Sequence, residues 1–259
     1  MDVPPLIPKP GPELQPPQMS VAARVLNVFA VPSATFEDVR ASVHSAGTWI
    51  VPGILSLVAG VTAFWLTLCQ PAALNEFRKV QQENFTKLVA GGKVEQAEAD
   101  QHLRVVHWMT QPAVARVLSV AMAGGVTTLR MFGWAFLLWL LAVLFLKVRL
   151  NFLKTLEVAG LATMVTVVGS IVAVALTTGF ARPDPSGSLL SQIDARTKST
   201  PFIVQANVFN IWFVTLLATG LARLAGVRLS QTLLLVMGTW LAVQLAIAIL
   251  GLGLASLSG

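Results

Sequence analysis

Five long apolar segments dominate the sequence and constrain its fold more than any motif does. They cover residues 49–69, 129–146, 156–178, 204–225 and 232–254. Each approaches the roughly 20 apolar residues that a helix needs to cross the hydrocarbon core of a bilayer. Backbone groups in hydrocarbon must find hydrogen-bond partners within their own segment, so these spans are expected to be helices. The sequence therefore predicts an all-α fold, a polytopic membrane bundle of five transmembrane helices over residues 46–256.

Composition excludes the main soluble alternatives. Charged residues make up only 12% of the chain, hydrophobic residues 55%, and the mean hydropathy is +0.72. A soluble domain carries about 25% charged residues. The single cysteine, Cys69, has no partner for an internal disulfide. A soluble enzyme, a disordered chain and a disulfide scaffold are thus disfavoured. The net charge of +6 comes from scattered basic residues without a basic run, so no nucleic-acid partner is expected.

The N-terminal region divides into a tail and two short amphipathic pieces. Residues 1–19 are proline-rich and predict a disordered, solvated tail. Within residues 20–45, apolar residues recur at helical spacing up to Pro32, and Thr35 with Asp38 is typical of a capping box opening a helix from Phe36 to Val43. These helices either lie at the membrane interface or form a cytosolic cap packed on the bundle. The candidate interfacial surface comprises Arg24, Phe29, Phe36 and Arg40.

The loop after the first span is the only sizeable polar element. Two amphipathic runs over residues 72–111 are separated by Gly91-Gly92. This pattern predicts an extracytoplasmic helical hairpin.

Arg130 interrupts the start of the second span. A central arginine costs about 2.5–3.5 kcal/mol even on the mildest insertion scale. We expect residues 112–124 to lie along the interface and to break at Gly124-Gly125, which leaves Arg130 at the headgroup level. The alternative is a buried pair with Glu157, near the start of the third span.

Basic residues in the short loops indicate the orientation. Lys147, Arg149 and Lys154 lie between the second and third spans, and Arg223 and Arg228 lie between the fourth and fifth. Cytoplasmic loops carry an excess of Lys and Arg. The N-terminus is therefore expected in the cytoplasm and the C-terminus on the extracytoplasmic side.

A search for chemistry yields polar positions rather than a reaction centre. The spacing of the three histidines does not match a metal-binding motif, and phosphate-binding and nucleophile motifs are absent from the sequence. We therefore expect no enzymatic activity, and we assign no catalytic residues, no cofactor-binding residues, no metal ligands and no cofactors. Asn207, Asn210 and Gln244 lie in or near the last two spans. They are expected either to bond neighbouring helices or, together with Arg130, to line a polar path.

Three stretches resemble the YIP family, five-span membrane proteins named for interacting with Ypt/Rab GTPases, in its bacterial branch. These are Arg24–Arg40 with Trp49–Pro52, then Phe152–Gly160, then Asn207–Trp212 followed by Gly220 and Trp240. The chain departs from the family pattern in having no tyrosine, and in carrying Asn207 where an acid is common. The resemblance implies a five-helix bundle with a cytosolic N-terminus and, in eukaryotic members, work in vesicle trafficking.

These observations together predict a non-enzymatic scaffold in a bacterial inner membrane. Its expected partners are the lipid bilayer and other membrane proteins or further copies of itself. The alternative is an accessory or permease subunit of a transport or export system. A water-filled cavity joining the polar positions favours transport, and a close-packed bundle favours a scaffold.

Overall fold

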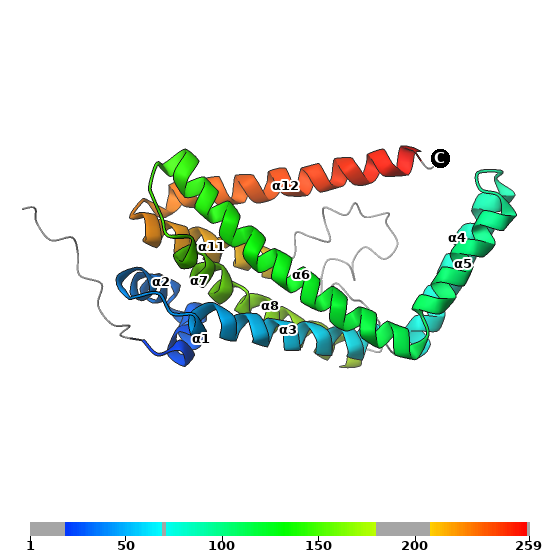
Figure 1. The fold of residues 1–259 in the computed structure, drawn as a ribbon, viewed down its shortest axis with the longest axis horizontal. Coiled ribbons are helices and arrows are strands. Elements are labelled where there is room, and N and C mark those ends of the chain that lie inside the picture. Colours follow the sequence, from blue (N-terminus) through cyan, green and yellow to red (C-terminus); the bar gives the residue numbers. More distant parts are fainter. Residues whose placement is uncertain (1–18, 69–70, 180–207, 258–259) are drawn as a thin grey trace, which may run out of the picture.

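A computed structural model describes residues 19–68, 71–179 and 208–257. The proline-rich tail, Cys69 and Asn207 lie outside these ranges. Within them every regular element is a helix, and α3, α6 and α12 extend at different angles between the end near α2 and the opposite end (Figure 1). The helices are α1 (Val21–Ala30), α2 (Pro32–Ala41), α3 (Gly47–Leu68), α4 (Pro71–Ala90), α5 (Gln96–Met109), α6 (Pro112–Leu141), the π-helix η1 (Ala142–Leu146), α7 (Phe152–Ala162), α8 (Met164–Gly179), α11 (Val208–Ala225) and α12 (Leu229–Leu257).

Among the described residues, four helical stretches are long and apolar enough to cross a membrane. They are Pro112–Leu146, Phe152–Val172, Val208–Ala225 and Leu229–Ala246. The all-α membrane fold is therefore confirmed at this level. The expected first span corresponds to α3, which has 22 residues. The apolar stretch described within it, Gly47–Ala63, is shorter than the four candidate spans. The five-span count stays a prediction.

The helix break expected at Gly124-Gly125 is wrong. Helix α6 begins at Pro112, runs through both glycines to Leu141 and continues into η1. Close packing does not require these glycines: a Cβ added at Gly124 would make an ordinary contact with Leu57 of α3 at 3.6 Å, and nothing lies within 4 Å of one added at Gly125. In a nonpolar environment an uninterrupted helix keeps its backbone hydrogen bonds, which outweighs the weak helix propensity of glycine.

Helix α7 lies at the centre of the packed end of the bundle, where α2, α3, α6 and α11 all contact it. All its residues from Thr155 to Ala162 are buried. Two glycines allow the closest approaches. A Cβ at Gly160 would overlap the backbone of Trp49 in α3, and one at Gly220 of α11 would overlap the side chain of Val158. Small residues at such positions let membrane helices approach closely.

The third expected span is divided at Thr163 into α7 and α8. The Thr163 hydroxyl donates to the carbonyl of Gly160 at 2.6 Å, and Ser56 of α3 donates to the Thr163 carbonyl at 3.2 Å. The Thr163 carbonyl also accepts from the amide of Thr166 at 2.8 Å and from its hydroxyl at 2.6 Å, so this group stays satisfied where the backbone is irregular.

The two N-terminal helices, which we call the N-terminal pair, meet at Pro32. The side chain of Ser20 caps α1 by accepting from the amide of Ala23 at 3.2 Å. The expected capping box is wrong, because α2 already begins at Pro32. Proline suits the first helical position, where its missing N–H needs no partner. Thr35 therefore lies inside α2, and its hydroxyl donates to the carbonyl of Val31.

Helices α4 and α5 form a hairpin that projects from the far end of α6 (Figure 1). The turn between them contains Gly92 with a φ of +68°, in the left-handed region that favours glycine. Arg78 of α4 holds the base of the hairpin by donating to the hydroxyl and carbonyl of Thr110 at 2.5 and 2.8 Å.

Candidate functional site

A cluster of buried charges lies where the N-terminal pair meets the first turns of α3 and α7. We call it the ion cluster: Arg24, Asp38, His44, Lys154 and Glu157. The side chains of Arg24 and Glu157 are 1% and 0% exposed. Charges at this depth are stable only when they are paired and hydrogen-bonded.

Arg24 is the centre of the cluster. Its Nε and Nη2 lie 2.8 and 2.7 Å from Oδ2 of Asp38 on α2. The guanidinium also donates to the hydroxyls of Ser42 at 2.7 Å and Thr48 at 2.9 Å. One side chain thus connects α1, α2 and the start of α3. The planar donor set of arginine suits such a connection, because it offers five N–H groups in a fixed geometry.

Glu157 brings α7 into the same network. Its Oε1 lies 2.7 Å from His44 Nδ1 and accepts from the amide of Ser45 at 3.0 Å. Lys154 Nζ is 3.4 Å from the same oxygen, and Arg24 Nη1 is 3.7 Å from Oε2. A carboxylate only accepts, so the His44 hydrogen bond requires the proton on Nδ1.

The ion cluster is electrically balanced when His44 is neutral. The cations Arg24 and Lys154 face the carboxylates of Asp38 and Glu157. Lys154 also donates to the carbonyl of Val39 in α2 at 2.7 Å. Among the residues that the structure describes, no group of three His, Cys, Asp or Glu side chains is placed to hold a metal ion. The ion cluster therefore connects the N-terminal pair to the bundle.

The pairing considered between Arg130 and Glu157 is wrong. Arg130 on α6 donates to Oδ1 of Asn210 at 3.0 Å, and its guanidinium carbon lies 4.1 Å from the ring centroid of Phe213. Both partners belong to the first turns of α11, whereas Glu157 lies among the last turns of α6 and the N-terminal pair. The interfacial position of Arg130 stays a prediction.

Of the other polar positions, Asn210 is the one that meets Arg130. Gln244 is half-buried on α12, which packs on α11. Of the three residues of the considered polar path that the structure describes, it therefore brings together two, Arg130 and Asn210.

The expected interfacial surface is also wrong in part. Arg24 and Phe36 are buried, at 1% and 0% exposure. Phe29 is half-buried against Trp212 of α11, with ring centroids 5.6 Å apart. Arg40 is exposed and pairs with Glu37 at 3.2 Å. Phe36 faces the bundle because burial rewards aromatic area, and Arg24 faces it because its partners lie there.

Sequence reasoning missed Asp38, His44, Lys154, Ser42 and Thr48 as members of one site. One signal was available: Arg24 is three residues after Val21 and four before Val28, so helical spacing places it on their apolar face. A charge on that face indicates a buried partner. The identity of the partners was not available, because Glu157 is distant in the sequence.

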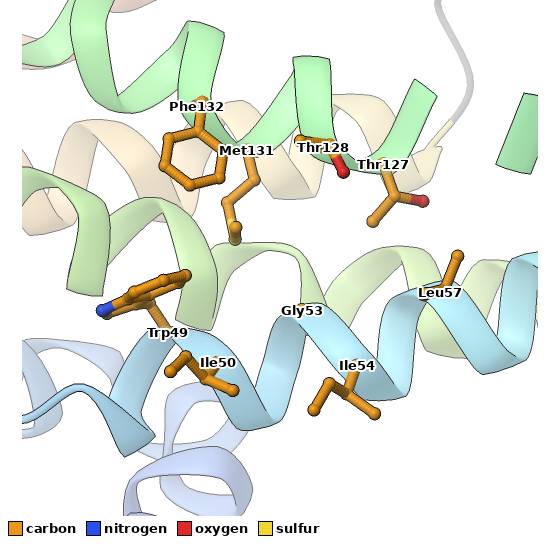
Figure 2. A pocket seen from close by; sticks show the side chains of 9 residues that line it. All are labelled: Trp49, Ile50, Gly53, Ile54, Leu57, Thr127, Thr128, Met131 and Phe132. Carbon is orange, nitrogen blue, oxygen red and sulfur yellow. The ribbon is translucent and has the colours of Figure 1, made fainter. Parts of the chain in front are cut away.

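An apolar groove lies between α3 and α6 (Figure 2). Its volume is about 210 Å³. Its lining consists of Trp49, Ile50, Gly53, Ile54, Leu57, Thr127, Thr128, Met131 and Phe132. Figure 2 shows Met131 reaching from α6 toward Gly53, with the hydroxyls of the two threonines at one end. The groove does not include Arg130, Asn210 or Gln244, so it does not join the polar positions.

The long apolar helices define a polytopic α-helical membrane protein. The model of the Yip1 domain matches residues 26–251, and the chain therefore belongs to the Yip1 family. This match confirms the resemblance to YIP proteins and covers most of the bundle and four of the five residues of the ion cluster, since Arg24 precedes it. No curated protein and no solved structure matches the chain significantly.

Proposed function

We propose that this Yip1-family protein is a non-enzymatic scaffold that binds partner membrane proteins, or further copies of itself, in the bilayer. The observation that carries the proposal is the contact of Arg130 with Asn210 and Phe213. These side chains pack on one another, and the groove between α3 and α6 leaves them out. A packed polar contact of this kind stabilises helix association, as interhelical hydrogen bonds do.

The hairpin is the protein-binding surface that we propose. Near its base, Phe77 on α4 is 49% exposed, and Trp108 and Val105 on α5 are 55% and 48% exposed. Aromatic residues are enriched where proteins bind one another. Because α4 and α5 pack mainly on each other, these side chains are available to a partner.

Site-specific photo-crosslinking in cells tests the scaffold. A benzophenone amino acid replaces Trp108 or Val105, and as a lipid-facing control Leu241 on α12, which is 46% exposed. We expect discrete protein adducts of constant mass at the two hairpin positions and none at Leu241. The proposal would be contradicted if the hairpin positions, like Leu241, gave no protein adducts.

The runner-up is a transport or export subunit, favoured by the meeting of Arg130 and Asn210 near one depth. In a background with Cys69→Ser, a Gln244→Cys variant tests whether water reaches the middle of α12. The scaffold predicts no reaction with a small charged thiol reagent. Rapid modification from either side of the membrane would favour transport.

We also propose that α3 is the fifth span, that the membrane is a bacterial inner membrane and that the N-terminus is cytoplasmic. The two basic loops support this orientation, since Lys147 follows η1, Arg228 precedes α12, and both loops lie at the end where α2 packs (Figure 1). Helix α12 runs from there toward the hairpin end (Figure 1).

Cysteine labelling tests the orientation. In the Cys69→Ser background, an impermeant maleimide added outside intact cells should label Lys93→Cys at the hairpin tip and leave Asn151→Cys unlabelled. The opposite pattern reverses the topology.

A further inference from the structure

We infer that the N-terminal pair is inserted sideways into one leaflet of the bilayer, with the outer side of α1 facing the boundary between headgroups and acyl chains. The ligand chemistry is the lipid surface itself, with anionic headgroups beside it. The inference goes beyond the proposed scaffold and does not depend on it, because it concerns lipid rather than a protein partner.

The first support is the depth at which the pair lies. Phe29 packs on Trp212 near the start of α11, and the guanidinium of Arg40 lies beside Gly226, just past its end. Helix α11 has 18 residues, about 27 Å of helix, and is one of the candidate spans. Helices α1 and α2 also contact α7, and α1 contacts α3. The pair therefore lies beside spanning helices rather than beyond their ends (Figure 1).

The second support is the apolar outer side of α1. Ala22, Leu26 and Ala30, spaced four residues apart, are exposed, and Leu26 is 69% exposed. Val31 and Val43, at the ends of α2, are 47% and 52% exposed. Helix α1 also contacts α3, whose Ile54 is 54% exposed. An apolar helix face at this depth is typical of interfacial helices, which bury it about 5–10 Å into the headgroup and acyl boundary.

The third support is the way in which charge is distributed. The charge of Arg24 on α1 is directed inward, where the ion cluster balances it, so α1 presents no charge to the lipid. The exposed charges of the pair are Glu37 and Arg40 on α2, beside the end of α11. Arg149 and Arg228 belong to the loops at that same end, where they complement anionic headgroups. This arrangement places the apolar side of α1 deeper in the bilayer and the exposed basic residues closer to the headgroups, as an inserted helix requires.

Collision measurements with spin labels test the insertion. The purified full chain, in the Cys69→Ser background and in nanodiscs of phosphatidylethanolamine and phosphatidylglycerol, carries one label at Leu26→Cys. Labels at Leu241→Cys and Lys93→Cys give the lipid and water references. A label at Glu37→Cys is the matched control on the same pair. Collisions with oxygen report lipid, and collisions with a water-soluble nickel complex report water.

We expect nickel collisions at Leu26 to be at least fivefold below those at Lys93, with oxygen collisions close to those at Leu241. Glu37 should fall between the two references. A Leu26 label as open to nickel as Lys93 would show that the pair faces water and would overturn the inference. Low collisions with both reagents would show protein covering α1, hence a second copy, and would overturn it equally. Neither result affects the crosslinking test of the scaffold, which reports on the hairpin.

Discussion

At the end of the bundle where the N-terminal pair packs, charged side chains are buried, whereas at the end where the hairpin projects, apolar side chains are exposed. Arg24 and Glu157 are at most 1% exposed in the ion cluster. Toward the hairpin, Val117 on α6 and Trp108 on α5 are 70% and 55% exposed, and the ion pair between Glu98 and His102 lies on the surface.

The difference shows where contacts within the protein take the place of contacts with lipid or with a partner. At the packed end, several helices meet and supply an ion-pair or hydrogen-bond partner for each charged residue of the cluster, although Oε2 of Glu157 accepts no hydrogen bond and only faces Arg24 at 3.7 Å. At the hairpin end, the helices diverge (Figure 1), and their apolar side chains depend on lipid or on a partner for burial. We therefore expect substitutions at the packed end to lower the stability of the isolated protein, and substitutions at the hairpin end to change its associations.

Loss of Arg24 should produce the largest effect. Arg24→Met leaves Asp38 and Glu157 buried with one cation fewer, so the free energy of unfolding should fall by about 3–5 kcal/mol. Titration with SDS in mild detergent, followed by tryptophan fluorescence, measures it. The control Arg40→Met removes an exposed pair and should cost at most about 1 kcal/mol. Equal effects of the two variants would remove the distinction between buried and exposed charges.

Gly160→Ala should have the next largest effect. The new methyl group would overlap the backbone of Trp49, which cannot move without displacing α3. Overpacking of this kind costs about 1–3 kcal/mol. Gly238→Ala on α12 is the matched control, because nothing lies within 4 Å of the added Cβ. If both variants unfold at the SDS concentration of the parent protein, the close approach of α3 and α7 is not as described.

The contact between Arg130 and Asn210 extends the comparison beyond the packed end. A double-mutant cycle with Arg130→Met and Asn210→Leu should give a coupling energy of about 1 kcal/mol, as interhelical hydrogen bonds in membranes do. The same SDS titration measures the four proteins of the cycle. Strictly additive effects would mean that the two side chains do not interact.

The smallest effect is expected at the break between α7 and α8. Ser56→Ala removes the hydrogen bond from α3 to Thr163, whose carbonyl still accepts from Thr166, and should cost about 0.6 kcal/mol. Thr239→Val is a suitable control, because the Thr239 hydroxyl bonds to the carbonyl of Leu235 in its own helix. A loss at Ser56 no larger than that at Thr239 would argue against a role for the α3 hydroxyl.

Much of the helical layout was predictable from the sequence, because local chemistry decides it. Apolar segments long enough to span a membrane became helices, Pro32 ended α1, and Gly91-Gly92 ended α4. The errors concern glycine and capping signals. Gly124-Gly125 did not break α6, because an uninterrupted helix keeps its backbone hydrogen bonds in a nonpolar environment. The Thr35–Asp38 pattern did not open α2, because that helix already begins at Pro32 and Asp38 binds Arg24 instead.

The candidate site was much less predictable. Arg24 was predicted to belong to an interfacial surface, although its spacing with Val21 and Val28 could have indicated that it faces inward. The partners come from α2, α3 and α7, and their mutual positions depend on how the helices cross. Likewise, the sequence offered a headgroup-level position or a pair with Glu157 for Arg130, and its meeting with Asn210 depends on the relative depth of α6 and α11, which spacing within one helix does not determine.

By itself the sequence determined that this protein is a helical membrane protein, because a chain so poor in charge and so rich in long apolar segments is stable only with lipid around it and with backbone hydrogen bonds inside each segment. Only the tertiary structure decided which charges meet. A buried ion pair needs atoms from distant segments within a few ångströms of one another, and that proximity arises when Gly160 and Gly220 allow α3, α7 and α11 to approach.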